Sequence, residues 1–239
     1  MMMTNKVSIN SKSNIEEFIA LLPIKAHSER IKNKNFKKLG NIPLFEWILN
    51  TLISIEEIDK IIINTDSEKI LKKNDLPRKV IVRERGKKLQ GDFVSMNKII
   101  EDDLNNSNGK YYLMTHATNP FLKSSTIINA LREFRIQLNE KKCDSLFSVN
   151  KFQSRFFDKY HYPINHNPNR LIRTQDLDPI YEENSCFYFF TKESFKLTKN
   201  RIGLNPNIFE TPKIESIDID DKEDWSLAEA VASYNKTQN

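Results

Sequence analysis

Residues 18–34 read Phe18-Ile-Ala-Leu-Leu-Pro-Ile-Lys-Ala-His-Ser-Glu-Arg-Ile-Lys-Asn-Lys34, an apolar run that ends in a cluster of positive charges. The apolar part, residues 18–23, does not alternate with polar residues. This pattern predicts a strand covered on both faces, as in a parallel sheet. In open α/β sheets, ligands bind beyond the carboxyl ends of the strands. The stretch therefore predicts a parallel sheet with an anion-binding loop after its first strand.

Further apolar runs of the same kind predict four more buried strands, at residues 60–66, 79–82, 111–114 and 145–149. Between them, apolar residues at helical spacing predict helices that begin near Pro43, Ser124 and Asp221. Strands that alternate with helices indicate βαβ units and an α/β fold. The alternation stops from Asn150 to about Glu183, a stretch rich in aromatic residues, Asn and Pro, which predicts an insertion within the domain.

The composition fits one globular domain. The chain has 239 residues, of which 38% are hydrophobic and 29% charged, and these proportions exclude a disordered or fibrous protein. Residues 1–17 are polar and lack the apolar core of a secretory signal. We expect residues 1–17 to be a flexible extension, residues 18–239 to be the domain, and the protein to be cytoplasmic with no membrane partner. The isolated Cys143 and Cys186 predict reduced thiols.

The loop after the first predicted strand carries much of the positive charge in a chain with a net charge of +5. Its cations are Lys25, Arg30, Lys32, Lys34, Lys37 and Lys38. Cations fixed at this place would neutralise a triphosphate and the charge that develops on departing pyrophosphate. Neither GxxxxGK[ST] nor GxGxxG occurs. On charge alone a solvated face is an equal expectation, but the position after the strand favours phosphate binding.

A second signal is Ser216-Ile-Asp-Ile-Asp220. If this segment is a strand, Asp218 and Asp220 lie on one face while Ile217 and Ile219 face the core. Two carboxylates so close would repel each other without a cation between them. Mg²⁺ is usually held by one or two carboxylates together with substrate phosphates. The segment predicts a Mg²⁺ site at Asp218 and Asp220, and Asp221 is expected to cap the helix that follows.

The basic loop resembles the signature of the CMP-sialic acid synthetases, the acylneuraminate cytidylyltransferases. That family reads A-R-x-x-S-K-x-x-x-x-K-N-[IL]-K and then L-x-G-x-P-L, and Ser28, Lys34 and Asn35 lie at matching positions. Lys25 stands where the family usually has Arg, which keeps the charge but loses the planar fork of the guanidinium. Matching segments follow in the same order from about Phe18 to Ala232.

The resemblance implies a Rossmann-like, mostly parallel sheet flanked by helices, of the nucleotide-diphospho-sugar transferase type. It also implies a small inserted region at residues 150–190 for sugar binding and dimer contact, and hence a homodimer. The implied activity is Mg²⁺-dependent transfer of CMP from CTP to the anomeric C2 hydroxyl of a nonulosonic acid, a sialic-acid-like sugar, with release of pyrophosphate. Asp220 is one candidate general base for this step, and none stands out.

The resemblance also implies the roles of individual residues. The catalytic residues would be Lys25, Arg30, Lys34 and Asp220. The nucleotide would contact Lys25, Ser28, Arg30, Lys34, Asn35, Asp92 and Ser95. The sugar would contact His116, Thr118, Asn119, Arg155, Arg173, Gln175, Tyr181 and Asn184.

The chemistry of the sugar-binding candidates agrees with these roles. Arg173 can bind a carboxylate through two parallel hydrogen bonds, and the amides of Gln175 and Asn184 suit hydroxyl and acyl groups. Tyr181 can pack on the apolar edge of a sugar. Arg155 is either a second anion contact or an ordinary surface ion pair. For Phe187 and Tyr188 we expect core packing rather than sugar contact.

Two alternatives stay open. The acceptor can be a related acid, such as legionaminic acid, pseudaminic acid, Kdo or a phosphonate, although the insertion resembles the animal branch of the sialic acid family, which argues against Kdo. A basic nucleotide- or RNA-binding protein without catalysis would also explain the loop. Asp218 and Asp220 argue against a nucleic acid partner, because paired carboxylates repel phosphate.

Overall fold

The computed structural model describes residues 17–237, with the side chains of residues 17–234. The predicted extension at residues 1–17 lies outside the described residues, apart from Glu17. No helix within residues 17–237 combines the length and the apolar character needed to cross a membrane. Both cysteines, Cys143 and Cys186, are buried thiols without a disulfide, as predicted.

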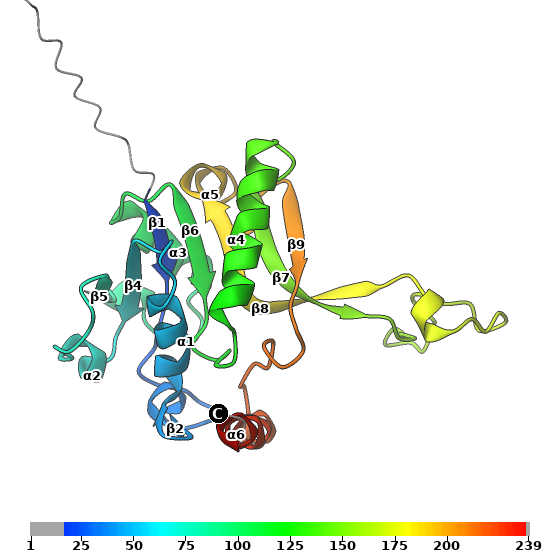
Figure 1. Cartoon of the computed structure of the whole chain (residues 1–239), viewed down its shortest axis with the longest axis horizontal. Coiled ribbons are helices and arrows are strands. Elements are labelled where there is room, and N and C mark those ends of the chain that lie inside the picture. Colours follow the sequence, from blue (N-terminus) through cyan, green and yellow to red (C-terminus); the bar gives the residue numbers. More distant parts are fainter. Residues whose placement is uncertain (1–16, 238–239) are drawn as a thin grey trace, which may run out of the picture.

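A seven-stranded sheet forms the centre of the molecule (Figure 1). In spatial order its strands are β5 (Val80–Glu84), β4 (Lys60–Thr65), β1 (Phe18–Leu21), β6 (Tyr111–Thr115), β8 (Ile180–Thr191), β7 (Ser145–Phe152) and β9 (Pro206–Glu210). β8 runs antiparallel to its neighbours β6 and β7, and every other neighbouring pair is parallel. The prediction of a mostly parallel α/β sheet is confirmed.

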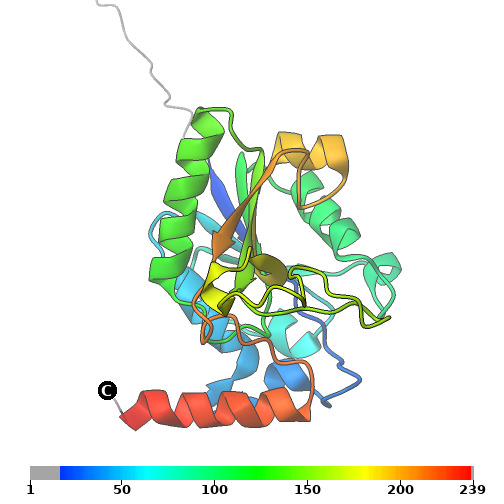
Figure 2. The same ribbon diagram turned by 90° about the vertical axis from the view of Figure 1, so that its right-hand side faces the viewer.

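Helices cover both faces of this sheet (Figure 2). On one face lie α1 (Leu44–Ile53) and α4 (Ser124–Asn139), and on the other lie α3 (Met96–Asn105) and α5 (Lys192–Thr198). The short α2 (Glu68–Leu71) packs near β5, the hairpin of β2 (Lys38–Leu39) and β3 (Ile42–Pro43) precedes α1, and α6 (Lys222–Thr237) ends the described chain.

The central strand β1 shows why its sequence lacks alternation. Phe18 and Ala20 pack in the core beneath α1 and α4, whereas Ile19 and Leu21 pack in the core beneath α3 and α5. All four side chains are fully buried. Burial of one large apolar side chain contributes about 1.5–3 kcal/mol, so the strand holds both helical layers on the sheet. Its carboxyl end, where the basic loop begins, is thereby fixed.

Beyond the sheet, β7 and β8 continue as an antiparallel pair and form a protruding arm, residues 150–183 (Figure 1). The inserted region expected at residues 150–190 covers this arm and also the second part of β8, where residues 187–190 pair with β6 in the main sheet. The apolar side chains of residues 187–190 hold that part of β8 in the core. Phe187 and Tyr188 are fully buried and pack in the two cores, as expected.

Candidate active site

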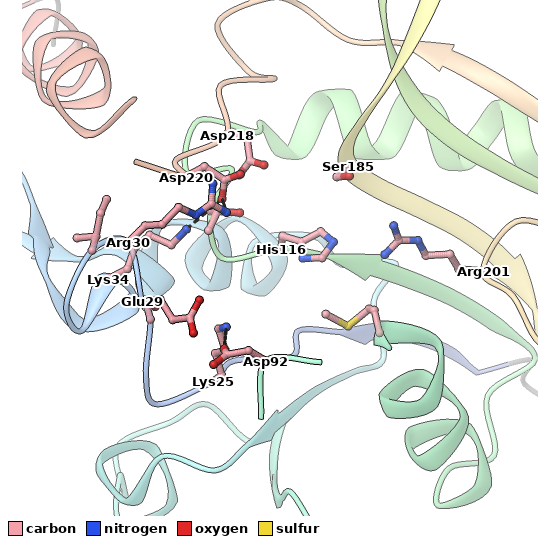
Figure 3. A pocket seen from close by; sticks show the side chains of 14 residues that line it. Lys25, Glu29, Arg30, Lys34, Asp92, His116, Ser185, Arg201, Asp218 and Asp220 are labelled. Carbon is pink, nitrogen blue, oxygen red and sulfur yellow. Dashed lines mark hydrogen bonds and ion pairs between the residues drawn. The ribbon is translucent and has the colours of Figure 1, made fainter. Parts of the chain in front are cut away.

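A cavity of about 530 Å³ lies where the loops after β1 and β6 meet the segment before α6 (Figure 3). It is lined by Lys25, Ser28, Glu29, Arg30, Ile31, Lys34, Asp92, Met96, His116, Thr118, Ser185, Arg201, Asp218 and Asp220. An adjoining cavity of about 220 Å³ shares Lys25, Lys34 and His116 and adds Asn35 and Arg85. The carboxyl ends of the parallel strands therefore form one continuous pocket region, as open α/β sheets commonly do.

The basic loop is pinned to the sheet and to itself. The backbone N–H of Ala26 donates to Asp66 Oδ1 at 2.7 Å, next to the end of β4. The side-chain amide of Asn35, itself buried, donates to the carbonyl of Lys25 at 3.0 Å. Asn35, predicted to bind nucleotide, therefore fixes the backbone from which Lys25 projects. A fixed loop can hold cations in place without reorganisation when an anion binds.

Three loop cations pair with carboxylates across the cavity. Lys25 Nζ lies 2.6 Å from Asp92 Oδ1, and this ion pair lowers the pKa of Asp92. Arg30 Nη2 lies 3.0 Å and Lys34 Nζ 3.4 Å from the same oxygen, Asp220 Oδ1. The structure thus brings the predicted phosphate-binding cations Lys25, Arg30 and Lys34 to one cavity.

The other lysines of the loop, Lys32, Lys37 and Lys38, are exposed and do not line the cavity. Lys37 instead lies over the ring of Trp225, with Nζ 3.9 Å from the ring centroid. The charge run therefore divides into cations that face the cavity and cations that form the solvated face expected of such runs.

The segment that carries Asp218 and Asp220 is not a strand, contrary to the prediction. The segment lies beside the loop after β6 and is joined to it by two hydrogen bonds. Ile219 N of the segment donates to the carbonyl of Thr118 at 3.0 Å, and Asn119 Nδ2 of the loop donates to the carbonyl of Ile217 at 3.4 Å. A loop does not offer the regular series of backbone hydrogen bonds that a neighbouring strand would, so the segment does not pair as a strand. Asp218 and Asp220 nevertheless line the same cavity, and Ile219 between them is fully buried.

Asp218 supplies a test of whether Mg²⁺ suits this place. Its Oδ1 is buried and has no hydrogen-bond partner in the described part of the chain, and burial raises the pKa of the carboxyl. A buried acceptor left without a partner costs free energy, and a bound divalent ion would remove that cost. No group of three or more Asp, Glu, His or Cys forms a metal site within residues 17–237. Two carboxylates fit Mg²⁺, which takes its remaining ligands from phosphate and water.

His116 and Thr118, predicted to contact sugar, line both cavities. Burial, reinforced by the positive charge of Arg201, lowers the pKa of His116 to about 3. The imidazole is therefore neutral near pH 7 and offers one hydrogen-bond donor and one acceptor.

Other predicted residues lie away from the cavity. Ser95 is exposed immediately before α3. The buried amide of Asn119 is used by the carbonyl of Ile217, and that of Asn184 is bonded to Asn150 Oδ1 and Thr211 Oγ1. The remaining sugar-binding candidates, Arg155, Arg173, Gln175 and Tyr181, lie on the exposed arm.

Sequence reasoning missed several residues of the cavities, among them Glu29, Arg85, Met96, Ser185 and Arg201. Arg85 directly follows β5, and its guanidinium is fixed by Asn64 through Nε at 2.9 Å and Nη2 at 2.7 Å. Its position after a strand is a signal that could have identified it. Arg201 and Ser185 have no such signal, because tertiary packing brings them to the cavity.

A family model described as cytidylyltransferase matches residues 19–238. N-acylneuraminate cytidylyltransferase A of Danio rerio is 27% identical over 218 residues, which cover 88% of this chain and 49% of the relative. Pseudaminic acid cytidylyltransferase of Campylobacter jejuni is 23% identical over 239 residues, which cover 91% of this chain and 97% of the relative. The chain thus spans about half the length of the first relative and nearly all of the second.

Two solved structures share the fold. A 4-diphosphocytidyl-2C-methyl-D-erythritol synthase from Anaerococcus prevotii superposes with a TM-score of 0.65 at 14% identity, covering 91% of this chain and 97% of that one. A CMP:2-keto-3-deoxy-manno-octonic acid synthetase complexed with CTP superposes with a TM-score of 0.62 at 10% identity, covering 92% and 99%. At these identities the structures establish the architecture and nothing finer.

Proposed function

We propose, because this chain belongs to the cytidylyltransferase family, that it transfers CMP from CTP to the anomeric C2 hydroxyl of a nonulosonic acid and requires Mg²⁺. The observation that carries the proposal is the cavity in which Lys25, Arg30 and Lys34 face Asp218 and Asp220. Cations alone suit any phosphate, whereas cations opposite a carboxylate pair suit a phosphate that arrives with a divalent ion.

The charges of the cavity support the requirement for Mg²⁺. Four of the lining residues are Lys or Arg, and four are Asp or Glu. With its carboxyl groups ionised, the cavity therefore has no excess positive charge for a triphosphate. A divalent ion bound at Asp218 and Asp220 would supply that excess and bring charge neutralisation next to the α-phosphate.

In the proposed reaction the C2 hydroxyl attacks the α-phosphorus of CTP, a new O–P bond forms, and pyrophosphate leaves with the electrons of the broken P–O bond. Lys25, Arg30 and Lys34 neutralise the triphosphate and the charge on the departing pyrophosphate. Arg30 and Lys34 are paired with Asp220 in the structure. We expect them to exchange this carboxylate for phosphate oxygens when CTP binds, which leaves Asp220 available for the metal or for the proton of the attacking hydroxyl.

We further propose a homodimer in which the arm of one chain completes the sugar pocket of the other. Arg155, Arg173, Gln175 and Tyr181 lie on the arm and outside the cavity of their own chain. The arm also exposes large apolar side chains, namely Phe157, Tyr160, Tyr162, Ile164, Leu171 and Tyr181. Six large apolar side chains exposed within residues 157–181 are more than isolated surface residues would explain, and they support a protein interaction site on the arm.

The acceptor stays open within one chemical class. The relatives include enzymes named for N-acylneuraminate and for pseudaminic acid, at similar identities, so both acids are candidates. The non-catalytic RNA-binding alternative receives no support, because Asp92, Asp218 and Asp220 lie among the cations and would repel a phosphate backbone.

The test is pyrophosphate release from CTP, Mg²⁺ and a panel of nonulosonic acids by the wild type, Asp220→Asn and Asp221→Asn. We expect Asp220→Asn to lower kcat by about 100-fold or more, as loss of a charge-stabilising group does. Asp221 is the matched control, since its Oδ1 accepts the N–H groups of Glu223 and Asp224 and Asn also caps helices. Near-wild-type turnover by Asp220→Asn would overturn the metal assignment.

A further inference from the structure

The cavity has a second polar wall that the phosphate-binding residues do not explain. Figure 3 shows Arg201 on the side of His116 that faces away from Arg30 and Lys34, with Ser185 nearby. All of these residues line the same cavity. Arg201 belongs to the loop between α5 and β9, so it reaches the cavity from a different part of the chain than the basic loop does.

Arg201 is held rigidly. Its guanidinium lies over the ring of Tyr188, 3.8 Å from the centroid, and Nη2 donates to Tyr188 Oη at 2.9 Å. Nη2 also lies 3.3 Å from Glu183 Oε1. The Arg201 side chain is only 18% exposed. Because these contacts already fix the side chain, a ligand that accepts from it incurs little further loss of conformational entropy.

The guanidinium keeps donors for a ligand. An arginine has five N–H groups and no acceptor. Within the described residues, Nη1 of Arg201 has only the sulfur of Met114, at 3.9 Å, as a partner, and a thioether is a weak acceptor. The donors that remain lie on a side chain lining the cavity.

Ser185 adds a polar group at the same wall. Its backbone has φ of 59°, in the left-handed region that disfavours any residue other than glycine. Such strain costs about 1–3 kcal/mol and is concentrated at functional sites. Tyr188 Oη has one hydrogen, which Glu183 Oε1 accepts, so the 3.1 Å contact between Tyr188 Oη and Ser185 Oγ uses the hydroxyl hydrogen of Ser185 and leaves Ser185 Oγ able to accept from a ligand. The wall therefore combines the donors of Arg201 with one acceptor, Ser185 Oγ.

We propose that Arg201 is the specificity-determining residue for the acceptor, donating hydrogen bonds to a planar C=O oxygen of the sugar acid, either its carboxylate or an acyl carbonyl. The inference rests on the proposed function, because it assigns the remaining wall of the same cavity to the acceptor. A triphosphate is a poor match for this wall, since Glu183 already balances part of the charge of Arg201. A single carboxylate or amide oxygen can bind through the N–H donors of Arg201 without an excess of positive charge at this wall.

The test compares Arg201→Met with the wild type in steady-state kinetics with CTP and Mg²⁺. Met keeps apolar contact with the Tyr188 ring but removes every donor. We expect the acceptor KM to rise about 10- to 100-fold, the value of a hydrogen bond to a charged group, while the CTP KM stays within about twofold. Arg132→Met, at an exposed position on α4, is the matched control and should change neither constant.

Two acceptors distinguish the two oxygen sources: an N-acylated nonulosonic acid, and the same acid with a hydroxyl in place of the acylamino group. A rise in KM for the N-acylated acid alone assigns the acyl carbonyl, and an equal rise in KM for both acids assigns the carboxylate. An unchanged acceptor KM for both acids overturns the proposal, and so does an equal rise in the KM for CTP, which indicates a structural role.

Arg201→Lys provides a second variant if Arg201→Met does not fold, as judged by CTP binding in calorimetry. It keeps the charge but loses the planar fork, and the proposal expects a smaller rise in the acceptor KM. If Arg201→Lys has the same acceptor KM as the wild type, the proposed role of Arg201 is contradicted. If the wild type turns over neither acid with CTP, the proposed function itself is overturned. If the wild type is active and the Arg201 variants have the same acceptor KM, only the role of Arg201 is overturned.

Discussion

Asn35 connects the folding of the basic loop with its function. Its buried amide donates to the carbonyl of Lys25 at 3.0 Å. In Asn35→Ala that carbonyl loses its partner, which we expect to lower the free energy of unfolding by about 1–2 kcal/mol. Lys25 then samples more positions, so the KM for CTP should rise as well. Urea unfolding and steady-state kinetics measure the two effects.

The control for this prediction is Asn105→Ala, at an exposed position at the end of α3. It removes the same side chain away from the cavities and should change neither stability nor the KM for CTP by a measurable amount. If Asn35→Ala is destabilised but binds CTP as the wild type does, Asn35 is a purely structural residue.

Asp103 predicts a pH dependence of stability. It is buried between Asn64 and Arg83, and burial raises its pKa from 3.8 to about 6. In the unfolded chain the proton is lost near pH 4. Between about pH 4 and 6 the folded protein binds a proton that the unfolded chain has released, so the contribution of Asp103 to stability decreases as the pH rises through this window. A shift of this size corresponds to about 3 kcal/mol at most.

Urea unfolding of the wild type and of Asp103→Asn at several pH values between 4 and 7 tests this prediction. Asn does not titrate, so the free energy of unfolding of the variant should decrease less as the pH rises. Asp102→Asn is the control, because Asp102 binds the same guanidinium at 3.0 Å but is 31% exposed. The charge of Asp102 raises the pKa of Asp103 less than burial does, so this variant should retain most of the wild-type slope. Identical slopes for the wild type and Asp103→Asn would contradict the assignment.

Individual residues of the site differ in how well the sequence predicts them. Lys25 and His116 follow buried strands, and Asp218 and Asp220 stand two apart between apolar residues, so local patterns place them at the site. Arg201 and Ser185 reach the cavity through packing on Tyr188. No local pattern encodes that contact, so their contribution required the three-dimensional structure.

At the scale of elements, the start of α6 sets the position of Asp220. Asp224 Oδ2 accepts the backbone N–H groups of Asp220 and Asp221, each at 2.9 Å. Asp221 Oδ1 accepts those of Glu223 and Asp224. The predicted cap at Asp221 is therefore present. The carboxylates of Asp221 and Asp224 both accept backbone N–H groups at the start of the helix. Only Asp224 accepts the backbone N–H of Asp220, the proposed metal-binding residue.

We therefore expect Asp224→Ala and Asp221→Ala to differ. Each should lose about 1 kcal/mol of stability, the usual value of a helix cap. Asp224→Ala should also raise the Mg²⁺ concentration for half-maximal activity by about 10- to 100-fold, because groups that orient metal ligands have effects of this size. Asp221→Ala should raise it less. A Mg²⁺ titration of pyrophosphate release measures this, and equal Mg²⁺ requirements in both variants would refute the role of Asp224.

The strands show where apolar patterns predict elements and where they do not. Helices cover both faces of β1, β4 and β6, so the continuous apolar runs of these strands were sufficient to predict them. The segment at residues 216–220 has the alternation of a strand, but it lies beside the Thr118 loop and not beside another strand. β8 was missed because its first part belongs to the exposed arm and its second part to the core, so its pattern changes within one strand.

At the scale of the whole molecule, the arm is the feature that one chain does not explain. It extends from the ends of β7 and β8 and exposes aromatic and aliphatic side chains, with Leu171 80% exposed. Arg173 is held on it by a two-point ion pair with Asp176, at 2.8 and 3.0 Å. Arg173 does not line the cavity of its own chain, so we expect it to contact the sugar in the cavity of another chain. Closed symmetric dimers meet this condition, because each arm can then reach the partner's cavity.

A mixture of two inactive variants tests this arrangement. Asp220→Asn has a defective cavity and an intact arm, whereas Arg173→Met has an intact cavity and a defective arm. If the arm acts across the dimer, each mixed dimer contains one intact cavity completed by one intact arm. Co-expressed variants should then recover about a quarter of wild-type turnover, since half of the dimers are mixed and each has one working site.

The same mixture separates the alternatives for Arg173. If the arm serves the cavity of its own chain, mixed dimers have no complete site and turnover stays at the level of the separate variants. If Arg173 does not contact the sugar, Arg173→Met alone keeps near-wild-type activity and there is nothing to recover. Light scattering on the purified mixture verifies that dimers are present. If turnover is then not recovered, the cause lies in the site and not in a failure to assemble. Recovery therefore requires both that the chain dimerises and that its sugar pocket is shared between two chains.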